Sequence, residues 1–165
     1  MARICLILEA TYPYVIGGVS QWVQLLTSGL PDFEFVISHL YTGEKPLDRK
    51  YRSPDNVKAI ATIPILTDSN HLDLKKFIET IPDADIYHAL STGFAGWLGK
   101  QVKLRKKKPL LITEHGIYWH EVEIGADEVE CGFKVINTET GRMNLGKTWQ
   151  TWLETFKSFA RECYE

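Results

Sequence analysis

The sequence predicts an α/β domain built on a doubly wound, mostly parallel sheet that is flanked by helices. Short apolar runs alternate along the chain with segments of helical periodicity, as they do in repeated β–α–β units. The first run, Ile4–Leu8, is apolar without a break, which is typical of a strand that helices cover on both faces. The length of 165 residues fits one domain with a sizeable core.

The first half of the chain continues from that strand through a turn-rich stretch into a helix. Apolar residues recur at helical spacing over Val19–Leu30, and a proline follows them directly. A segment rich in β-branched and aromatic residues predicts a second strand at Phe33–Tyr41, and a polar segment with two prolines predicts a surface loop at Thr42–Asn56. The other elements expected in this half are a strand at Val57–Ile65 and a short helix at His71–Ile81.

The second half begins with a strand at Ala84–Leu90, after which Ser91 or Thr92 can cap a helix. A further strand is expected at Leu110–Thr113. The segment Val122–Asn144 shows no clear period, and a long amphipathic helix is expected at Leu145–Tyr164. Its Trp-rich stripe indicates core packing on the sheet or a surface that normally covers another domain. The apolar face of the helix after Thr92 is formed by Phe94, Ala95, Leu98 and Val102.

Composition excludes several classes of protein. A net charge of -2 argues against nucleic acid as a partner, because phosphate backbones require a basic face. Three widely spaced cysteines without a CxxC pair argue against a disulfide framework and a zinc site. The chain lacks an 18-residue apolar stretch and a secretory signal, so a cytoplasmic location is expected. The basic run Lys103–Lys108 is interpreted as a solvated helix end in preference to a membrane contact.

The turn between the first strand and the first helix contains the pair Gly17-Gly18. Ligands of open α/β sheets bind beyond the carboxyl ends of the strands, where glycines let the backbone approach an anion and a helix start supplies N–H groups. The pair matches neither GxGxxG nor a Walker loop. From the residues alone, the pair fits both a phosphate-approach loop and a purely structural turn.

A second group of polar residues follows the strand at Ala84–Leu90. His88, Ser91 and Thr92 converge on the same edge of the predicted sheet. A buried, hydrogen-bonded histidine is the alternative interpretation of His88. Glycines at 93 and 96 are costly in a helical turn, so they indicate close packing or close approach of a ligand.

A third group, Glu114, His115 and Tyr118, follows the strand at Leu110–Thr113. We expect these side chains to bind a polar substrate by hydrogen bonds. A metal enzyme based on His115, His120 and Glu121 is the alternative, although the spacing is not HExxH and no cysteine joins the group.

These three segments, taken in order, closely resemble the N-terminal region of PelF-like glycosyltransferases. The resemblance spans almost the whole chain, although the long segment that the family carries between the first two motifs is heavily shortened here. It implies a retaining enzyme of the GT-B fold, in which two Rossmann-like domains face each other across a cleft. Residues 1–165 would then be the N-terminal, acceptor-side domain, inactive without the C-terminal domain that grips the nucleotide.

The resemblance also implies roles for residues. Gly17 and Gly18 would approach the diphosphate of a nucleotide-sugar donor, a UDP-sugar, and His115 would be the catalytic residue beside the transferred sugar. The leaving diphosphate would be stabilised electrostatically, without a metal or a permanently bound cofactor. The acceptor would be a polysaccharide or glycoconjugate, and the full-length protein could associate peripherally with the inner face of the membrane. Residues expected to line the cleft are His88, Ser91, Thr92, Glu114 and Tyr118.

A non-catalytic Rossmann-like module that binds a sugar, a nucleotide or a protein partner is the remaining alternative. A reading frame that continues into a second domain would favour the glycosyltransferase, and one that ends at Glu165 would favour the module.

Overall fold

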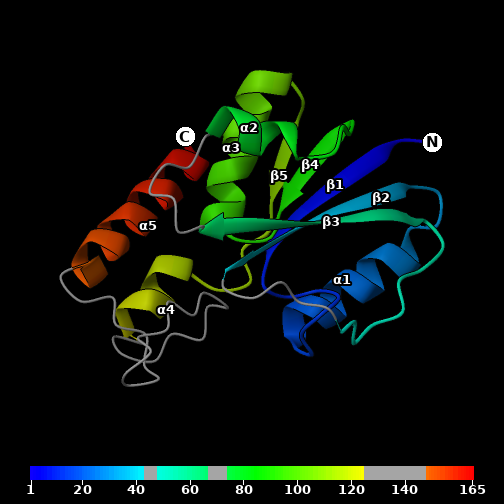
Figure 1. Ribbon diagram of the computed structural model, residues 1–165, viewed down its shortest axis with the longest axis horizontal. Helices are drawn as coiled ribbons and strands as arrows, with labels where there is room; N and C mark the ends of the chain where they lie inside the picture. The colour runs from blue at the N-terminus through cyan, green and yellow to red at the C-terminus, as the bar shows by residue number, and fades with distance from the viewer. Residues whose placement is uncertain (43–47, 67–73, 125–147) are drawn as a thin grey trace.

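The computed structural model describes residues 1–42, 48–66, 74–124 and 148–165 as a layered α/β domain (Figure 1). The described strands form one parallel sheet in the order β3-β2-β1-β4-β5. The elements in chain order are β1 (Arg3–Glu9), α1 (Gly18–Gly29), β2 (Glu34–Thr42), β3 (Val57–Leu66), α2 (Leu74–Glu79), β4 (Ile86–Ala89), α3 (Phe94–Lys106), β5 (Leu110–Ile112), α4 (Tyr118–Ile124) and α5 (Thr148–Tyr164).

The strand order reverses direction beside β1, which pairs with β2 on one side and with β4 on the other. This is the order of a Rossmann-like fold, so the predicted doubly wound α/β class is confirmed. The chain runs outward from β1 to β3 and then returns to β4, so that two connections diverge at the carboxyl ends of β1 and β4 and leave a crevice there. Any site built on this fold is therefore expected at that edge.

Alternate residues of β1 enter two separate cores, because successive side chains of a strand point to opposite faces. Leu6 is fully buried on the face that α1 covers, where Val23 packs against the sheet. Ile7 is fully buried on the other face, beneath helices α2, α3, α4 and α5 (Figure 1). The unbroken apolar run of the first strand is thereby explained: both faces of β1 are covered.

The last helix, α5, packs against α3 and α4 and closes the second core. Its apolar residues Leu153, Phe156 and Ala160 are buried, so core packing is the role of this part of the predicted stripe. Trp149 and Trp152 belong to the same predicted stripe, but their side chains lie outside the described residues, as does the predicted start of the helix at 145–147.

Several element bounds differ from the sequence prediction; β4, for example, covers Ile86–Ala89 where a strand at Ala84–Leu90 was expected. Helix α2 ends at Glu79 instead of Ile81, because Thr80 and Ile81 form turns whose N–H groups bond to the carbonyls of Phe77 and Ile78. Helix α4, at Tyr118–Ile124, was not predicted. It has only seven residues, too few for a helical period to stand out, and Val122 is its one buried residue.

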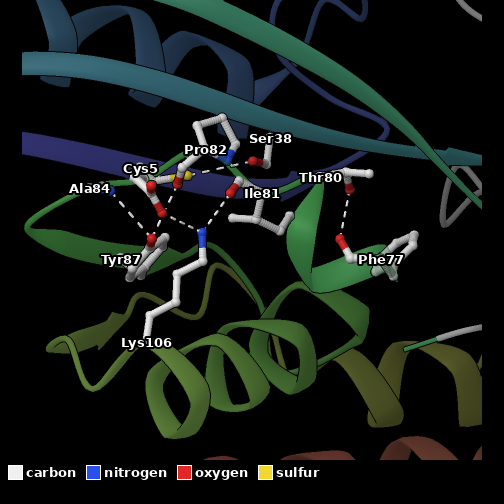
Figure 2. Close-up of polar contacts among 10 residues, drawn as sticks. Cys5, Ser38, Phe77, Thr80, Ile81, Pro82, Ala84, Tyr87 and Lys106 are labelled. Atoms are coloured by element: carbon white, nitrogen blue, oxygen red, sulfur yellow. Dashed lines mark hydrogen bonds and ion pairs between the residues drawn. The ribbon is translucent and has the colours of Figure 1, made fainter. Parts of the chain in front are cut away.

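The basic end of α3 is less solvated than predicted. The ammonium group of Lys106 donates hydrogen bonds to the carbonyl oxygen of Ile81 at 2.8 Å and to Asp83 at 2.7 Å (Figure 2). The hydroxyl of Tyr87 donates to the carbonyl of Pro82 at 3.1 Å. Lys106 thus stabilises the connection between α2 and β4. Lys103 and the other basic residues at this end of α3 are exposed, as expected. Among the described residues, no helix has both the length and the apolarity needed to cross a bilayer.

Gly96 lets α3 approach both the preceding turn and α5. A Cβ atom at this position would lie 2.5 Å from the carbonyl oxygen of Ser91 and 2.8 Å from Sγ of Cys163. Close packing therefore explains the glycine at this position near the start of α3.

We expect Gly96→Ala to destabilise the chain by about 1–3 kcal/mol, because an added methyl group meets backbone that cannot move away easily. The free energy of unfolding from denaturant titration measures this. Gly29→Ala in α1 is the matched control, since a Cβ there meets nothing within 4 Å and no loss is expected. Equal stabilities of the two variants would contradict the prediction.

Candidate functional site

A pocket of about 260 Å³ lies at the carboxyl edge of the sheet, where β1 and β4 end. Its walls come from the turn after β1, the start of α1, the turn after β4 and the segment between β5 and α4. This is the point at which the strand order reverses, where open α/β sheets bind their ligands. The lining residues are Leu8, Glu9, Ala10, Thr11, Val19, Leu90, Ser91, His115, Gly116, Tyr118 and Glu121.

Glu9 ends β1 and holds the first turn of α3. Its Oε1 accepts a hydrogen bond from the N–H of Ala95 at 2.6 Å, and its Oε2 accepts one from the hydroxyl of Ser91 at 3.0 Å. The N–H groups at a helix start favour a negative charge nearby. Burial nevertheless outweighs these donors and raises the pKa of Glu9 to about 7. The carboxyl group can therefore exchange a proton near neutral pH.

The turn between β4 and α3 is arranged around this carboxyl group. The hydroxyl of Ser91 also accepts the N–H of Gly93 at 3.2 Å. A Cβ at Gly93 would lie 3.0 Å from Oε1 of Glu9 and 2.9 Å from the ring of Tyr118, so the chain passes too close to both for a side chain. Helix α3 begins at Phe94, and its N-cap residue, Gly93, has no side chain that could cap the helix. The prediction that Ser91 or Thr92 caps this helix is therefore wrong, and the Glu9 carboxylate takes that role.

His115 and His88 lie on the α1 side of the sheet edge, and each contacts Trp22. The Trp22 ring meets His115 edge-on with centroids 4.9 Å apart and His88 with centroids 5.8 Å apart. Nε2 of His88 is hydrogen-bonded to Oγ1 of Thr113 at 2.8 Å. Burial, and then the neighbouring His115, lower the pKa of His88. His88 is thus a partnered, mainly neutral side chain that supports the site, whereas His115 is exposed at the pocket.

Thr92 and Glu114 lie on the opposite face from His115. The Thr92 hydroxyl donates to one oxygen of Glu114, and the hydroxyl of Tyr164 donates to the other. Because Glu114 directly precedes His115, this pair of bonds connects the segment after β5 to the turn before α3 and to the end of α5. His115 therefore lines the pocket, while its neighbour Glu114 is held outside the lining by these two bonds.

Gly17 and Gly18 begin α1 at the same edge but do not line the pocket. Gly17 has an extended backbone, with φ 177° and ψ 175°, that any residue can adopt. A Cβ at either position would meet no atom within 4 Å. Neither backbone conformation nor packing within the described chain therefore requires these glycines.

The structure gathers only part of the predicted site around one pocket. Three of the eight predicted residues, Ser91, His115 and Tyr118, line it, and the other five do not. The sequence prediction did not include Glu9. A charged residue at the end of an otherwise apolar strand is nevertheless a signal for a site at this edge of the sheet. Among the described residues, no three His, Cys, Asp or Glu side chains come together as a metal site, so His115, His120 and Glu121 do not form one.

Fold and pocket together define a Rossmann-like α/β domain with a pocket at the point where its strand order reverses. The chain belongs to the family described as "Domain of unknown function (DUF3492)", which matches residues 2–79 and 71–165. No curated protein matches it.

Among solved structures, the chain is similar to a sucrose-phosphate synthase from Thermosynechococcus elongatus, with a TM-score of 0.50 and 17% sequence identity. The similarity covers 94% of this chain and 40% of the synthase chain. The likeness concerns the fold, and the chain spans well under half the length of that protein.

Proposed function

We propose that this chain is the N-terminal domain of a retaining, PelF-like glycosyltransferase of the GT-B fold. It would transfer a sugar from a nucleotide-sugar donor, a UDP-sugar, to a polysaccharide or glycoconjugate acceptor. The observation that carries the proposal is the pocket at the carboxyl edge, which His115, Ser91 and Tyr118 line together. The similarity in fold to a sucrose-phosphate synthase supports it.

The start of α1 is the proposed contact for the donor's diphosphate. A helix of 12 residues begins here with free space beside both glycines, no acidic residue in its first turn and no side-chain cap bond. Its first N–H groups and its dipole favour an anion at this end. Glycines that the described fold does not require are consistent with close approach of a ligand to the backbone.

His115 is the proposed catalytic residue. It lines the pocket with an exposed ring that Trp22 holds from one side, so that its nitrogens can bond to hydroxyls of the transferred sugar. Chemistry would depend on electrostatic stabilisation of the leaving diphosphate, without a metal. We propose that a C-terminal domain supplies the grip on the nucleotide, and we use "full-length protein" for this chain together with that domain.

The proposal is tested by a donor screen that measures the melting temperature of the full-length protein. One or more UDP-sugars should raise Tm, because a ligand that binds only the folded state stabilises it. The free sugars at the same concentration are the control. If no nucleotide sugar shifts Tm, the glycosyltransferase proposal falls, and a shift with free sugar alone would favour a sugar-binding module.

We expect the double variant Gly17→Ala, Gly18→Ala to weaken binding of the UDP-sugar about tenfold, because two methyl groups keep the diphosphate from the backbone N–H groups. Its stability should be unchanged, since neither Cβ meets an atom within 4 Å. Calorimetric titration with the donor measures the affinity. Gly29→Ala, at the other end of the same helix, is the control and should bind normally; unaltered affinity in the double variant would argue against a phosphate role.

A further inference from the structure

The pocket combines acidic and neutral polar groups. Two acidic residues line it, Glu9 at the end of β1 and Glu121 in α4. The lining residues with a hydroxyl group are Thr11, Ser91 and Tyr118. Among the described residues of the lining, none is lysine or arginine, and the basic nitrogens there belong to His115.

The two carboxyl groups differ in how they are held. Hydrogen bonds from Ala95 and Ser91 hold Glu9. The carboxyl group of Glu121 lies against Gly116, so closely that a Cβ on this glycine would overlap Oε1. Carboxylate oxygens accept hydrogen bonds and repel other anions. A ligand that enters between them must therefore present hydroxyl or N–H donors.

Thr11 adds an independent observation. Its Oγ1 is buried and has no hydrogen-bond partner among the described residues, although the residue lines the pocket. A buried hydroxyl without a partner is unfavourable, so a polar ligand atom beside it would be stabilising. Thr11 can both donate to and accept from a hydroxyl group.

Two cationic side chains lie at the other end of the sheet, whereas Arg49 lies near Tyr12 in the turn after β1. Lys106 and Lys108 lie at the amino edge, paired with Asp83 and Asp85 at 2.7 Å and 3.7 Å. Figure 2 shows Lys106 directed toward the start of β4, away from the strand's carboxyl end. The two lysines are therefore not placed to neutralise an anion in the pocket.

The volume of the pocket sets the size of the ligand. About 260 Å³ is close to the lower end, roughly 300 Å³, of the range for small-molecule sites. This volume suits one sugar ring and is too small for several. Apolar walls from Leu8, Val19 and Leu90 can cover the face of such a ring.

We propose that this pocket binds a single uncharged, hydroxyl-rich sugar ring and rejects phosphorylated or carboxylated rings, with Glu9 and Glu121 as the specificity-determining residues. This inference rests on the proposed function and assigns the ring to the acceptor, while the exposed imidazole of His115 contacts the transferred sugar. Selectivity comes chiefly from the repulsion that an anionic ring meets between two carboxyl groups.

The test is a ligand-observed NMR titration of the full-length protein with three probes: methyl α-glucoside, glucose 6-phosphate and glucuronic acid. The uncharged glucoside should bind at least about tenfold more tightly than either anion at pH 8, where Glu9 is ionised. The double variant Glu9→Gln, Glu121→Gln should reduce this preference to within about threefold. Glu123→Gln is the matched control, because Glu123 lies on the same helix but pairs with Lys157 outside the pocket lining.

Equal or tighter binding of glucose 6-phosphate by the unaltered protein would overturn the inference, as would a preference that persists in the double variant. The test separates the inference from the proposed function. Binding of the glucoside without transfer from any donor would refute the glycosyltransferase and leave the pocket's selectivity standing. Transfer to phosphorylated acceptors in preference to neutral ones would refute the pocket's selectivity and leave the glycosyltransferase standing.

Discussion

Replacing His115 by alanine is expected to lower kcat/KM for sugar transfer by the full-length protein about 10²- to 10³-fold. Removal of one preorganised polar group at a reacting centre typically has an effect of this size. His115 is exposed at the pocket, and its imidazole supplies the basic nitrogens of the described lining. Initial rates of UDP release with a saturating acceptor measure the loss.

His120→Ala is the matched control for this experiment. His120 is also exposed, five residues further on in α4, but it does not line the pocket. Its removal should change the rate less than about twofold, since surface substitutions away from a site have small effects. A His115→Ala protein that keeps its full rate, or an equal loss in both variants, would refute the catalytic assignment.

Glu9→Gln is expected to flatten the dependence of stability on pH. Burial raises the pKa of Glu9 from 4.5 to about 7, so the folded chain binds more protons than the unfolded chain between these values. The favourable contribution of the protonated carboxyl group is fully present below pH 4.5 and is lost as pH rises through 7. At 1.36 kcal/mol per unit, ionisation of this group costs at most roughly 3 kcal/mol. Glutamine stays neutral and avoids that cost.

The measurement is the free energy of unfolding of the 165-residue chain at pH 5 and pH 8 for both proteins. His39 acts in the opposite direction, because burial lowers the pKa of this histidine to about 4 and stability falls as pH drops below 6.5. Its contribution is the same in both proteins and cancels in the difference. Exposed Glu79→Gln is the control. If the free energy of unfolding of Glu9→Gln does not rise relative to that of Glu79→Gln between pH 5 and pH 8, the raised pKa of Glu9 is refuted.

The fold was readable from the sequence because its evidence is local. The run Ile4–Leu8 predicted a strand covered on both faces, and alternate members do enter two cores. The glycine at 96 indicated close packing, and Ser91 and Cys163 leave no room there for a side chain. Helix α4 escaped prediction because seven residues with one buried side chain carry almost no periodicity.

The pocket was only partly readable, because its composition depends on which way each side chain points. Strand ends placed His115 and Ser91 at the correct edge, and the structure puts both in the lining. Glu114 and Thr92 share that edge but bond to each other on the opposite face. In the sequence, Glu9 is a charged residue at the end of a buried strand. Its hydrogen bond to Ala95 joins residues that are 86 positions apart. Contacts over such a separation leave no pattern in a single sequence.

We propose that the pocket belongs to a retaining transferase that uses a nucleotide sugar. The most direct measurement is an NMR spectrum of the product formed by the full-length protein from an α-configured UDP-sugar and an uncharged sugar acceptor. We predict a new glycosidic bond with the α configuration of the donor and a yield that falls in the His115→Ala protein. A β-configured product, or no product with any UDP-sugar, would contradict the account.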